Sequence, residues 1–442
     1  MANRDPRIFT IPASAPFLPV LIRALLEGRL VPSFPEPGSD PLRLAGATLY
    51  LPTRRACRLA RDVFLDSLGV EAAILPRIVP IGDVDEDELG FAEAANAGLG
   101  EAALDLPRAL GGLERRLLLA QLIGKWAATP AARGAGGTPL IAGTPAAALA
   151  LADDLAHLID DMTTRQIAWE RLDGLVPENV DAYWQKTLAF LTFIRGHWAN
   201  ILAAHEAIEP AARRDLLIAA ERKRLADAGG PVIAAGSTGS MPATAELLTT
   251  IARLPHGAVV LPGLDTDLDE NAWKLIGGRH DPSRRDHLDP ASGHPQFAMH
   301  GLLRRLNIGR DALTVLAEPE PHGRERFCSE ALRPAAATDH WQDQLADPGL
   351  DRHIATAVNS LAVVETANAE EEALAIAVAL REAAEDVSKT AALITPDRGW
   401  RGACWRRSTA GRCRSTIPAA MRCLTRRPVY SRGLPPRRRS AA

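Results

Sequence analysis

Cysteine is scarce in this sequence, and the few cysteines are spaced in a way that argues against a zinc site. Cys57 and Cys328 are isolated, and the last three, Cys404, Cys413 and Cys423, are nine and ten positions apart. Zinc fingers and ribbons use cysteine or histidine pairs that lie only a few residues apart. We therefore predict no structural zinc, and a reduced, cytoplasmic protein is the simplest interpretation.

Long apolar runs are also absent. Charged residues interrupt every apolar stretch well before the roughly 18 residues that a membrane-spanning helix needs. The first residues, MANRDPRIFTIPASAPF, lack the basic start and the continuous apolar run of a secretory signal. We expect no contact with a membrane.

Acidic residues are missing from the C-terminal stretch 399–442, which contains twelve arginines. Without these arginines, 39 of the 51 basic residues remain against 54 acidic residues, a formal charge of −15. The body of the chain therefore lacks the broad positive field of a protein that coats DNA. Any binding site for nucleic acid would therefore have to be a local groove.

The abrupt change of composition after Arg398 predicts that residues 399–442 are out-of-frame translation. One GC-rich codon choice for residues 398–420, read in another frame, encodes an amphipathic helix followed by a strand and a turn. The alternative is a genuine basic tail that binds nucleic acid. Arginines without counter-charges would not build a core over the strand before them, so we expect a frayed, protease-sensitive end. The nucleotide sequence around codon 398 distinguishes the two interpretations.

The apolar pattern predicts a parallel α/β sheet that is interrupted by a helical insertion. Apolar runs at 7–12 and 47–51 predict buried strands, and each is followed by a turn and by apolar residues at helical spacing. From about 101 to 225 the pattern is almost wholly helical. Strand patterns return at 231–236 and 257–265 with a helix between them, and such alternation is typical of parallel sheets.

The later part of the sequence is less regular. Residues 265–355 are charged and rich in proline, so we predict irregular structure there, and residues 361–398 then give a strand, a helix and a strand. These patterns divide the chain into five regions. They are the first half of an α/β lobe (1–100), a helical insertion (101–228), the remainder of the first lobe (229–355), the start of a truncated second lobe (356–398) and the basic tail (399–442).

The turn after the first strand lacks the residues that bind nucleotide phosphates. A P-loop, G-x-x-x-x-G-K-[ST], surrounds phosphate oxygens with glycine N–H groups and adds the charge of a lysine. Here the turn reads PASAP, residues 12–16, with two prolines, no glycine and no lysine. The strand that could carry a magnesium-binding acid reads VIAAGSTGSM, without a carboxylate. ATP binding and hydrolysis are therefore not expected.

Seven dispersed segments resemble the N-terminal part of the alphaproteobacterial AddB family. They lie in collinear order between residues 7 and 398: FTIPASAPFL, ATLYLPTRRACR, LPRIVPIGDVDEDEL, RLDGLVPENVDAYWQKTLAFL, VIAAGSTGSMPATAELL, HPQFAMHGLLRRL and TAALITPDR. The resemblance implies a degenerate superfamily 1 helicase-like, or P-loop NTPase-like, parallel sheet. It also implies the B subunit of a heterodimeric helicase–nuclease that resects double-strand DNA breaks for recombinational repair, in which the A subunit supplies the motor.

The same resemblance implies a passive role for this chain. In the family, an iron–sulfur cluster and magnesium belong to a C-terminal nuclease domain, whose ligands lie downstream of the matched region. We therefore expect no cofactor and no catalysis in this chain alone. Its implied role is a non-motor scaffold that binds single-stranded DNA at a resected end and pairs with the A subunit.

The resemblance also supplies candidate DNA contacts. LPTRRA falls where related helicases place a strand-end loop against the single-strand backbone, which makes Thr53, Arg54 and Arg55 candidate phosphate contacts. TPDR begins the analogous loop of the second lobe and makes Thr395 and Arg398 similar candidates. The alternative is that Thr53 caps the following helix and that the arginines are ordinary surface residues.

Three further patterns are better explained by structure than by function. Asp153, His157 and Asp160 or Asp161 share a helical face and could collect a metal, but a solvated acidic face is the simpler interpretation. GDVDEDEL, residues 82–89, lacks the spacing of a calcium loop and predicts an exposed loop. Four tryptophans in helical segments predict packing rather than base stacking: Trp126, Trp169, Trp184 and Trp198.

Two other functions remain open from the sequence. The chain could be a divergent P-loop ATPase with an unrecognised phosphate loop. It could also be an adaptor that binds a protein partner through its helical region and never touches DNA. Nucleotide binding tests the first alternative, and the binding of single-stranded DNA by wild type and an Arg54→Ala/Arg55→Ala variant tests the second.

Overall fold

A computed structural model of the chain describes residues 5–34, 41–81, 106–133, 142–172, 182–226, 229–281, 286–342, 346, 348–359, 361–386, 388–389 and 391–395. The acidic segment 82–89, Arg398 and the basic stretch 399–442 lie outside the described residues. The chain divides into two compact units, Met1–Val358 and Asn359–Ala442.

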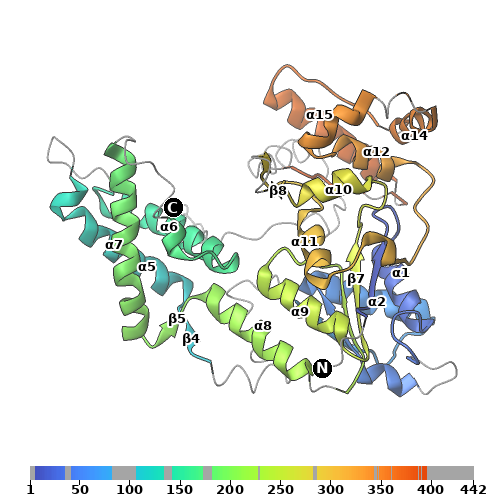
Figure 1. Ribbon diagram of the computed structural model, residues 1–442, viewed down its shortest axis with the longest axis horizontal. Coiled ribbons are helices and arrows are strands. Elements are labelled where there is room, and N and C mark those ends of the chain that lie inside the picture. Colours follow the sequence, from blue (N-terminus) through green and yellow to red (C-terminus); the bar gives the residue numbers. More distant parts are fainter. Residues whose placement is uncertain are drawn as a thin grey trace, which may run out of the picture. The chain divides into compact units, whose positions relative to one another are not determined.

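A six-stranded parallel sheet lies within the first unit (Figure 1). Its strands are β1 (Ile8–Ile11), β2 (Thr48–Leu51), β3 (Arg77–Pro80), β6 (Val232–Ala235), β7 (Gly257–Pro262) and β10 (Thr314–Val315). They follow the order β10–β1–β7–β6–β2–β3, and every neighbouring pair is parallel. The prediction of a parallel α/β sheet is confirmed.

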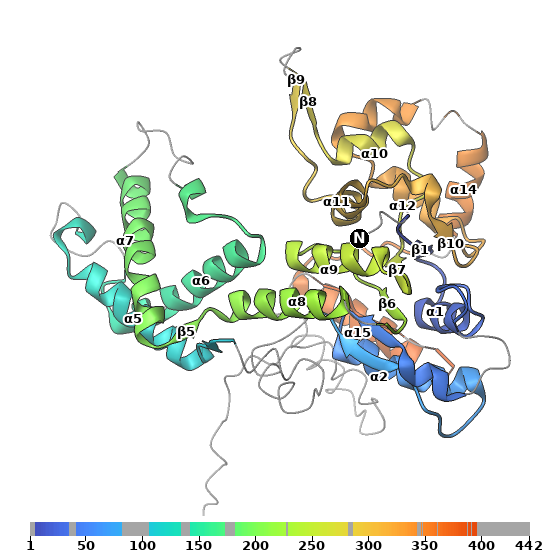
Figure 2. The same cartoon turned by 60° about the horizontal axis from the view of Figure 1, so that its bottom comes forward.

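Helices cover both faces of this sheet (Figure 2). One face packs against α1 (Phe17–Leu26) and α2 (Arg54–Leu68), and the other packs against α8 (Pro210–Ala226), α9 (Pro242–Arg253), α10 (Glu270–Ile276) and α11 (Phe297–Leu306). Because side chains alternate along a strand, Ile8 joins the core beside α9, whereas Phe9 and Ile11 join the core beside α1. Strands buried on both faces have nearly continuous apolar sequences, which is why the sequence revealed β1, β2, β6 and β7.

The two outer strands were not predicted as strands. The sequence of β3 is RIVP, which begins with a charge and ends with proline, and β10 has only two residues, Thr314 and Val315. Val315 is 44% exposed, as expected at the edge of a sheet. Neither segment has the long apolar run that marks a central strand.

The prediction of irregular structure at 265–355 is wrong for much of this region. It contains α10 and α11, α12 (Arg324–Ala331), α14 (Pro348–Val358) and an antiparallel hairpin of β8 (Arg279–Asp281) and β9 (Asp286–Leu288). These elements are short, and local caps define them. The carboxylate of Asp269, for example, accepts hydrogen bonds from the N–H groups of Asn271 and Ala272 at 3.0 Å and begins α10. A periodic pattern does not develop over so few turns.

The insertion between β3 and β6 is helical, as predicted. It contains α5 (Gly112–Ala127), α6 (Pro145–Thr164) and α7 (Ala182–Ala204), together with a small parallel pair of strands, β4 (Arg108–Ala109) and β5 (Ala207–Ile208). Trp126 and Trp198 are each 4% exposed in its core, so the predicted packing role is confirmed for both. The last helix of the predicted insertion, α8, places Ile218 and Leu225 in the core of the α/β sheet.

A buried ionic cluster joins the helical region to the start of α8. The Arg115 guanidinium lies 2.7 Å from the Glu209 carboxylate and 2.9 Å from that of Asp160. The Trp198 indole N–H donates to Glu209 at 2.5 Å. Burial raises the pKa of Glu209, and Arg115 and Trp198 oppose this shift. The cluster therefore ties α5, α6 and α7 to the segment that leads into α8.

Five short 3₁₀ helices connect the longer elements of the described chain: η1 (Pro41–Gly46), η2 (Pro130–Ala132), η3 (Trp169–Leu172), η4 (Arg310–Ala312) and η5 (Ala335–His340). None of the helices in the described ranges has both the length and the apolar character needed to span a bilayer.

The described part of the second unit contains one long helix, α15 (Ala369–Glu385). The Asn368 side chain accepts hydrogen bonds from the N–H groups of Glu370 and Glu371 at 3.0 Å and caps this helix. The strands predicted on either side of it are not formed within 361–366 and 391–395. Val363 is 90% exposed and Ile394 is 93% exposed, because a strand needs a hydrogen-bonding neighbour and the described part of this unit supplies none.

Candidate nucleic-acid interface

The carboxyl ends of the parallel strands meet at one edge of the sheet, where α/β proteins commonly bind ligands. The segments after β1, β7, β6 and β2 follow one another along this edge in the order of the strands. These segments begin at Pro12, Gly263, Gly236 and Pro52. The chemistry of each segment determines what this edge can bind.

The segment after β1 lies at the position of the nucleotide-binding loop in P-loop proteins. Its Ser14 and Ala15 N–H groups and the Ser14 hydroxyl already form hydrogen bonds within the protein. The Ser14 N–H group donates to the Glu325 carboxylate of α12 at 2.9 Å, and the Ser14 hydroxyl accepts from the Glu320 N–H group at 2.9 Å. The Ala15 N–H group donates to the Pro12 carbonyl at 3.2 Å. A carboxylate therefore binds where a P-loop would bind phosphate, just before the N-terminus of α1.

The segment after β7 is rich in aspartate, but its carboxylates support turns and helix ends. Asp265 accepts hydrogen bonds from the N–H groups of Asp267 and Leu268 at 2.9 Å and from the Ser329 hydroxyl at 3.0 Å. Asp269 caps α10 and pairs with Arg333. Burial alone would raise the pKa of Asp269, but its hydrogen bonds outweigh this effect and lower the pKa. Throughout the part of the chain that the structure describes, no three acidic, histidine or cysteine side chains are grouped to hold a metal.

The segment after β2 contains the three candidate DNA contacts of the first lobe. Thr53 is the N-cap of α2, and its hydroxyl oxygen accepts a hydrogen bond from the Ala56 N–H group at 3.1 Å. The capping role that the sequence left open is therefore confirmed. The Thr53 hydroxyl keeps its own proton as a donor. Arg54 is half-buried and Arg55 is exposed in the first turn of the same helix.

Two further arginines extend this basic end along α2. Arg54, Arg58 and Arg61 are four and three positions apart and so share one face of the helix. Arg58 and Arg61 are exposed, and neither forms an ion pair with a described residue. Burial raises the pKa of the Cys57 thiol, while the nearby charges of Arg61 and Arg54 oppose the shift. The sequence analysis stopped at Arg55, although the helical spacing of Arg58 and Arg61 was visible.

The segment after β6 is a glycine and hydroxyl loop, Gly236 to Ser240, that leads into α9. Gly236 and Gly239 have φ angles of 79° and 70°, a region that favours glycine. A side chain at Gly236 would meet the Pro52 ring at 3.2 Å, so this loop contacts the segment after β2. A cavity of about 210 Å³ lies here, lined by Pro52, Ile81, Gly236, Ser237, Thr238, Ser240, Met241 and Thr244.

The candidates of the second lobe are not brought to this edge by any described contact. Thr395 is half-buried in the second unit and belongs to no strand. Arg398 lies outside the described residues. Their assignment as DNA contacts therefore stays a prediction.

The acidic face of α6 is partly neutralised by arginines rather than fully solvated. Asp153 pairs with Arg116 of α5 at 2.7 Å, and Asp160 pairs with Arg115. His157 is exposed on the same helix. Arginine partners compete with a metal ion for these carboxylates, so the structure gives the metal alternative no support.

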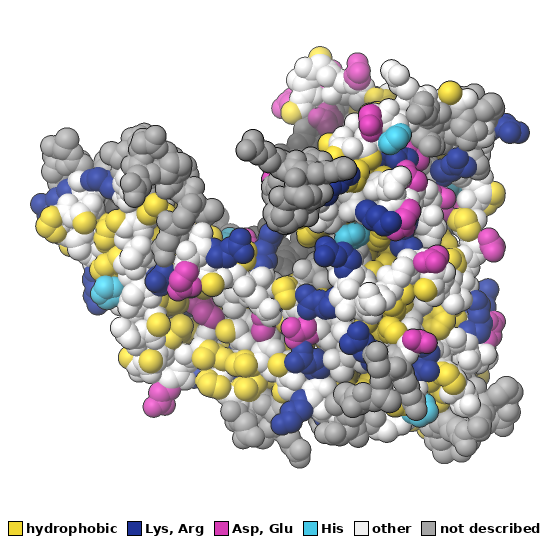
Figure 3. Space-filling model, viewed as in Figure 1, with side chains coloured by type: hydrophobic (Ala, Val, Ile, Leu, Met, Phe, Trp, Pro, Cys, Tyr) yellow, Lys and Arg dark blue, Asp and Glu magenta, His cyan; other side chains and the backbone are white. Residues whose placement is uncertain are grey.

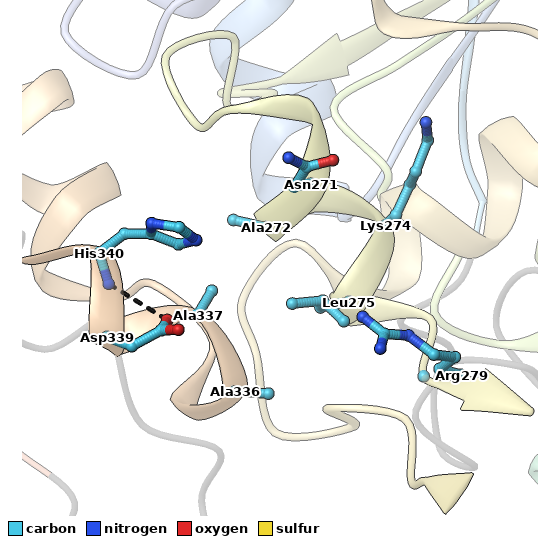
Figure 4. A pocket seen from close by; sticks show the side chains of 10 residues that line it. Asn271, Ala272, Lys274, Leu275, Arg279, Ala336, Ala337, Asp339 and His340 are labelled. Atoms are coloured by element: carbon cyan, nitrogen blue, oxygen red, sulfur yellow. Dashed lines mark hydrogen bonds between the residues drawn. The ribbon is translucent and has the colours of Figure 1, made fainter. Parts of the chain in front are cut away.

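A second cavity, of about 540 Å³, lies among α10, β8 and η5 (Figure 4). The His340 N–H group donates to the Asp339 carboxylate at 3.1 Å, and the Lys274 side chain extends away from the space. Lys274 also lies 3.8 Å from Glu270 on the same helix. Among the described residues that line this cavity there is no serine, threonine or cysteine to serve as a hydroxyl or thiol nucleophile.

Charge on the visible surface is mixed. Figure 3 shows basic and acidic side chains interspersed over one face of the molecule. On this face, the described residues therefore form no broad, purely basic surface. The candidate interface that these residues define lies at the carboxyl edge of the sheet, at Thr53, the arginines of α2 and the loop after β6.

Neither the protein-family models nor the curated proteins include a match to this chain.

Proposed function

We propose that the chain is the N-terminal region of an AddB-type helicase–nuclease B subunit, with a non-motor role in double-strand break repair. In this role a superfamily 1 helicase-like lobe binds single-stranded DNA and pairs with the motor-bearing A subunit. An iron–sulfur cluster and magnesium belong to the nuclease half of such a protein, and no described residue of this chain is assigned to hold either.

The observation that carries the non-motor role is the contact between Ser14 and Glu325. A negative carboxylate at 2.9 Å from the Ser14 N–H group repels a triphosphate from the loop after β1. Pro12 and Pro16 supply no N–H groups to replace it. The end of β6 adds no carboxylate that could hold magnesium. These features favour a scaffold over a divergent ATPase.

Support for DNA binding comes from the N-terminus of α2. Guanidinium groups bind phosphate oxygens through paired hydrogen bonds, and a helix N-terminus adds a favourable partial charge. Arg54, Arg58 and Arg61 share one helix face, and Arg55 and Thr53 lie at its first turn. A single strand that follows this face would meet several phosphate contacts in succession.

The experiment is a titration of a fluorescent single-stranded oligonucleotide, followed by anisotropy. Arg54→Ala/Arg55→Ala is expected to weaken binding at least tenfold, because each phosphate contact contributes to affinity. The matched control is Arg304→Ala/Arg305→Ala, an exposed arginine pair on α11 at the opposite face of the sheet. Equal affinity for wild type and the α2 variant would contradict the assignment.

A second candidate, a protein-interaction adaptor, is favoured by one observation. Leu113 and Leu117 lie on successive turns of α5 and are 62% and 46% exposed. Large contiguous apolar patches mark contacts with partner proteins, and this pair would contribute to such a patch. An adaptor of this type would leave the oligonucleotide unbound in the same titration.

A further inference from the structure

Thr244, in the first turn of α9, has a buried hydroxyl group without a hydrogen-bond partner among the described residues. The residue is 3% exposed. Buried hydroxyl groups are normally satisfied, so an unpaired one needs an explanation. The other threonines of the helix, Thr249 and Thr250, donate to the carbonyls of Ala245 and Glu246 at 2.7 and 3.0 Å. Thr244 alone among them is left without a partner, and it lines the 210 Å³ cavity.

The cavity offers donors from two directions. The hydroxyl-bearing residues Ser237, Thr238 and Ser240 line it from the loop after β6, and Thr244 lines it from α9. No described side chain caps α9, and Pro242 stands in its first turn without an N–H group. The next N–H groups of the turn, at Ala243 and Thr244, therefore remain available as donors.

The charge of the cavity suits an anion. None of the described residues that line it carries a carboxylate, and the N-terminus of α9 contributes a positive partial charge. The first turn of α1 differs, because Glu325 already lies beside its loop. One water molecule occupies about 30 Å³ of liquid, so 210 Å³ accommodates a phosphate group with some of its hydration.

The position of the cavity connects it with the candidate interface. β6 and β2 are neighbours, with Tyr50 paired to Ala234, so the loops that follow them lie side by side. Pro52, which directly precedes Thr53, is part of the cavity wall. A phosphate bound here would lie next to the phosphates that Thr53 and the arginines of α2 are proposed to contact.

We propose that this cavity binds one phosphate group, with the Thr244 and Ser237 hydroxyls and the first N–H groups of α9 as donors. The identification of that group as a backbone phosphate of single-stranded DNA rests on the proposed function. Free inorganic phosphate has the same chemistry, and the two sources are separated by experiment.

The test compares wild type with Thr244→Val, which keeps the shape of the side chain and removes the hydroxyl. Inorganic phosphate binding is measured by calorimetry, and binding of a fluorescent oligothymidylate by anisotropy. Thr244→Val is expected to weaken both about tenfold, the effect of losing one hydrogen bond to a charged group. Thr250→Val on the same helix is the matched control and is expected to bind both ligands like wild type. Ser237→Ala, at a half-buried loop position, provides a second variant that does not disturb the core.

Each outcome separates this proposal from the proposed function. If oligothymidylate binding is lost in Arg54→Ala/Arg55→Ala but is unchanged in Thr244→Val and Ser237→Ala, the phosphate site is wrong and the DNA-binding role stands. If phosphate binds in a Thr244-dependent manner and the oligonucleotide does not bind, the site is correct and the DNA-binding role is wrong. If wild type binds neither ligand, both are wrong.

Discussion

Single residues at the carboxyl edge of the sheet differ in how their polar groups are satisfied. Asp269 accepts hydrogen bonds on one carboxylate oxygen and pairs with Arg333 through the other, Asp265 accepts three hydrogen bonds on its Oδ1 atom, and Ser14 is engaged by Glu325. Thr53 caps a helix and retains a donor. Thr244 has no partner within the described chain. A buried polar group without a partner needs an explanation, and a bound water, ion or ligand is one of them.

The unsatisfied hydroxyl predicts that Thr244→Val stabilises the ligand-free protein. Removing a buried polar group that lacks a partner relieves a desolvation cost of about 1 kcal/mol. Urea unfolding in phosphate-free buffer measures the change. Thr250→Val is the comparison, because it removes a hydroxyl that is bonded within α9 and should not stabilise the protein. A loss of stability in Thr244→Val would mean that the hydroxyl has a partner in the native state.

At the scale of elements, a buried polar contact joins α8 to the central sheet. The Tyr50 hydroxyl of β2 donates to the Glu221 carboxylate of α8, and Arg224 donates to the same carboxylate at 2.7 and 2.8 Å. Burial alone would raise the pKa of Glu221, but the hydrogen bonds from Arg224 and Tyr50 outweigh it and lower the pKa. Burial and the Glu221 charge raise the pKa of Tyr50, which therefore remains a donor.

This contact predicts how stability depends on pH. A carboxyl group with a lowered pKa in the folded state stabilises the protein above its unfolded pKa, about 4.3. The stabilisation is lost as the pH falls from that value through the lower folded pKa. Glu221→Gln should therefore cost about 1–2 kcal/mol at neutral pH and flatten the decline of stability below about pH 4.3. Urea unfolding across this range is the measurement.

The control for this prediction is Glu27→Gln, at an exposed carboxylate that follows α1. It is expected to leave the acid limb of the stability curve unchanged. A variant at Glu221 whose curve keeps the steepness of wild type would show that another group causes the acid dependence.

The helices and strands that could be predicted from the sequence are those that are most completely buried. β1, β2, β6 and β7 were predictable because helices cover both of their sides and require continuous apolar sequences. The contact between Ser14 and Glu325 joins residues 311 positions apart, and no local pattern predicts it. The loop Gly236 to Ser240 did carry a signal, glycines and hydroxyls between a strand and a helix. The proposal that this loop forms part of a phosphate site depends on the Thr244 hydroxyl, whose lack of a partner among the described residues is visible only in the packed structure.

At the scale of the whole molecule, the two units differ in how much they bury. The first contains the sheet and both of its cores. In the described part of the second, α15 buries only Ala373 and Ala377. Apolar residues on either side of α15 are exposed, including Val363 and Ile394. A segment that buries so little has little free energy to resist local unfolding.

We therefore predict that limited digestion with trypsin cleaves at Arg381 and Lys389 before it cleaves within α2. Arg58 and Arg61 are exposed too, but α2 packs against the sheet through Cys57, Ala60 and Phe64, which makes it an internal control. Mass spectrometry of the early fragments identifies the order of cleavage. Simultaneous cleavage in both units would contradict the difference in stability.

The central claim is that the lobe is a passive scaffold, because a carboxylate occupies the place of a nucleotide phosphate. Calorimetric titration of the purified chain with magnesium and ATP tests this most directly. The account predicts no saturable binding in the micromolar range, for wild type and for a Ser14→Ala control alike. Saturable micromolar binding of ATP to the wild-type chain would contradict it.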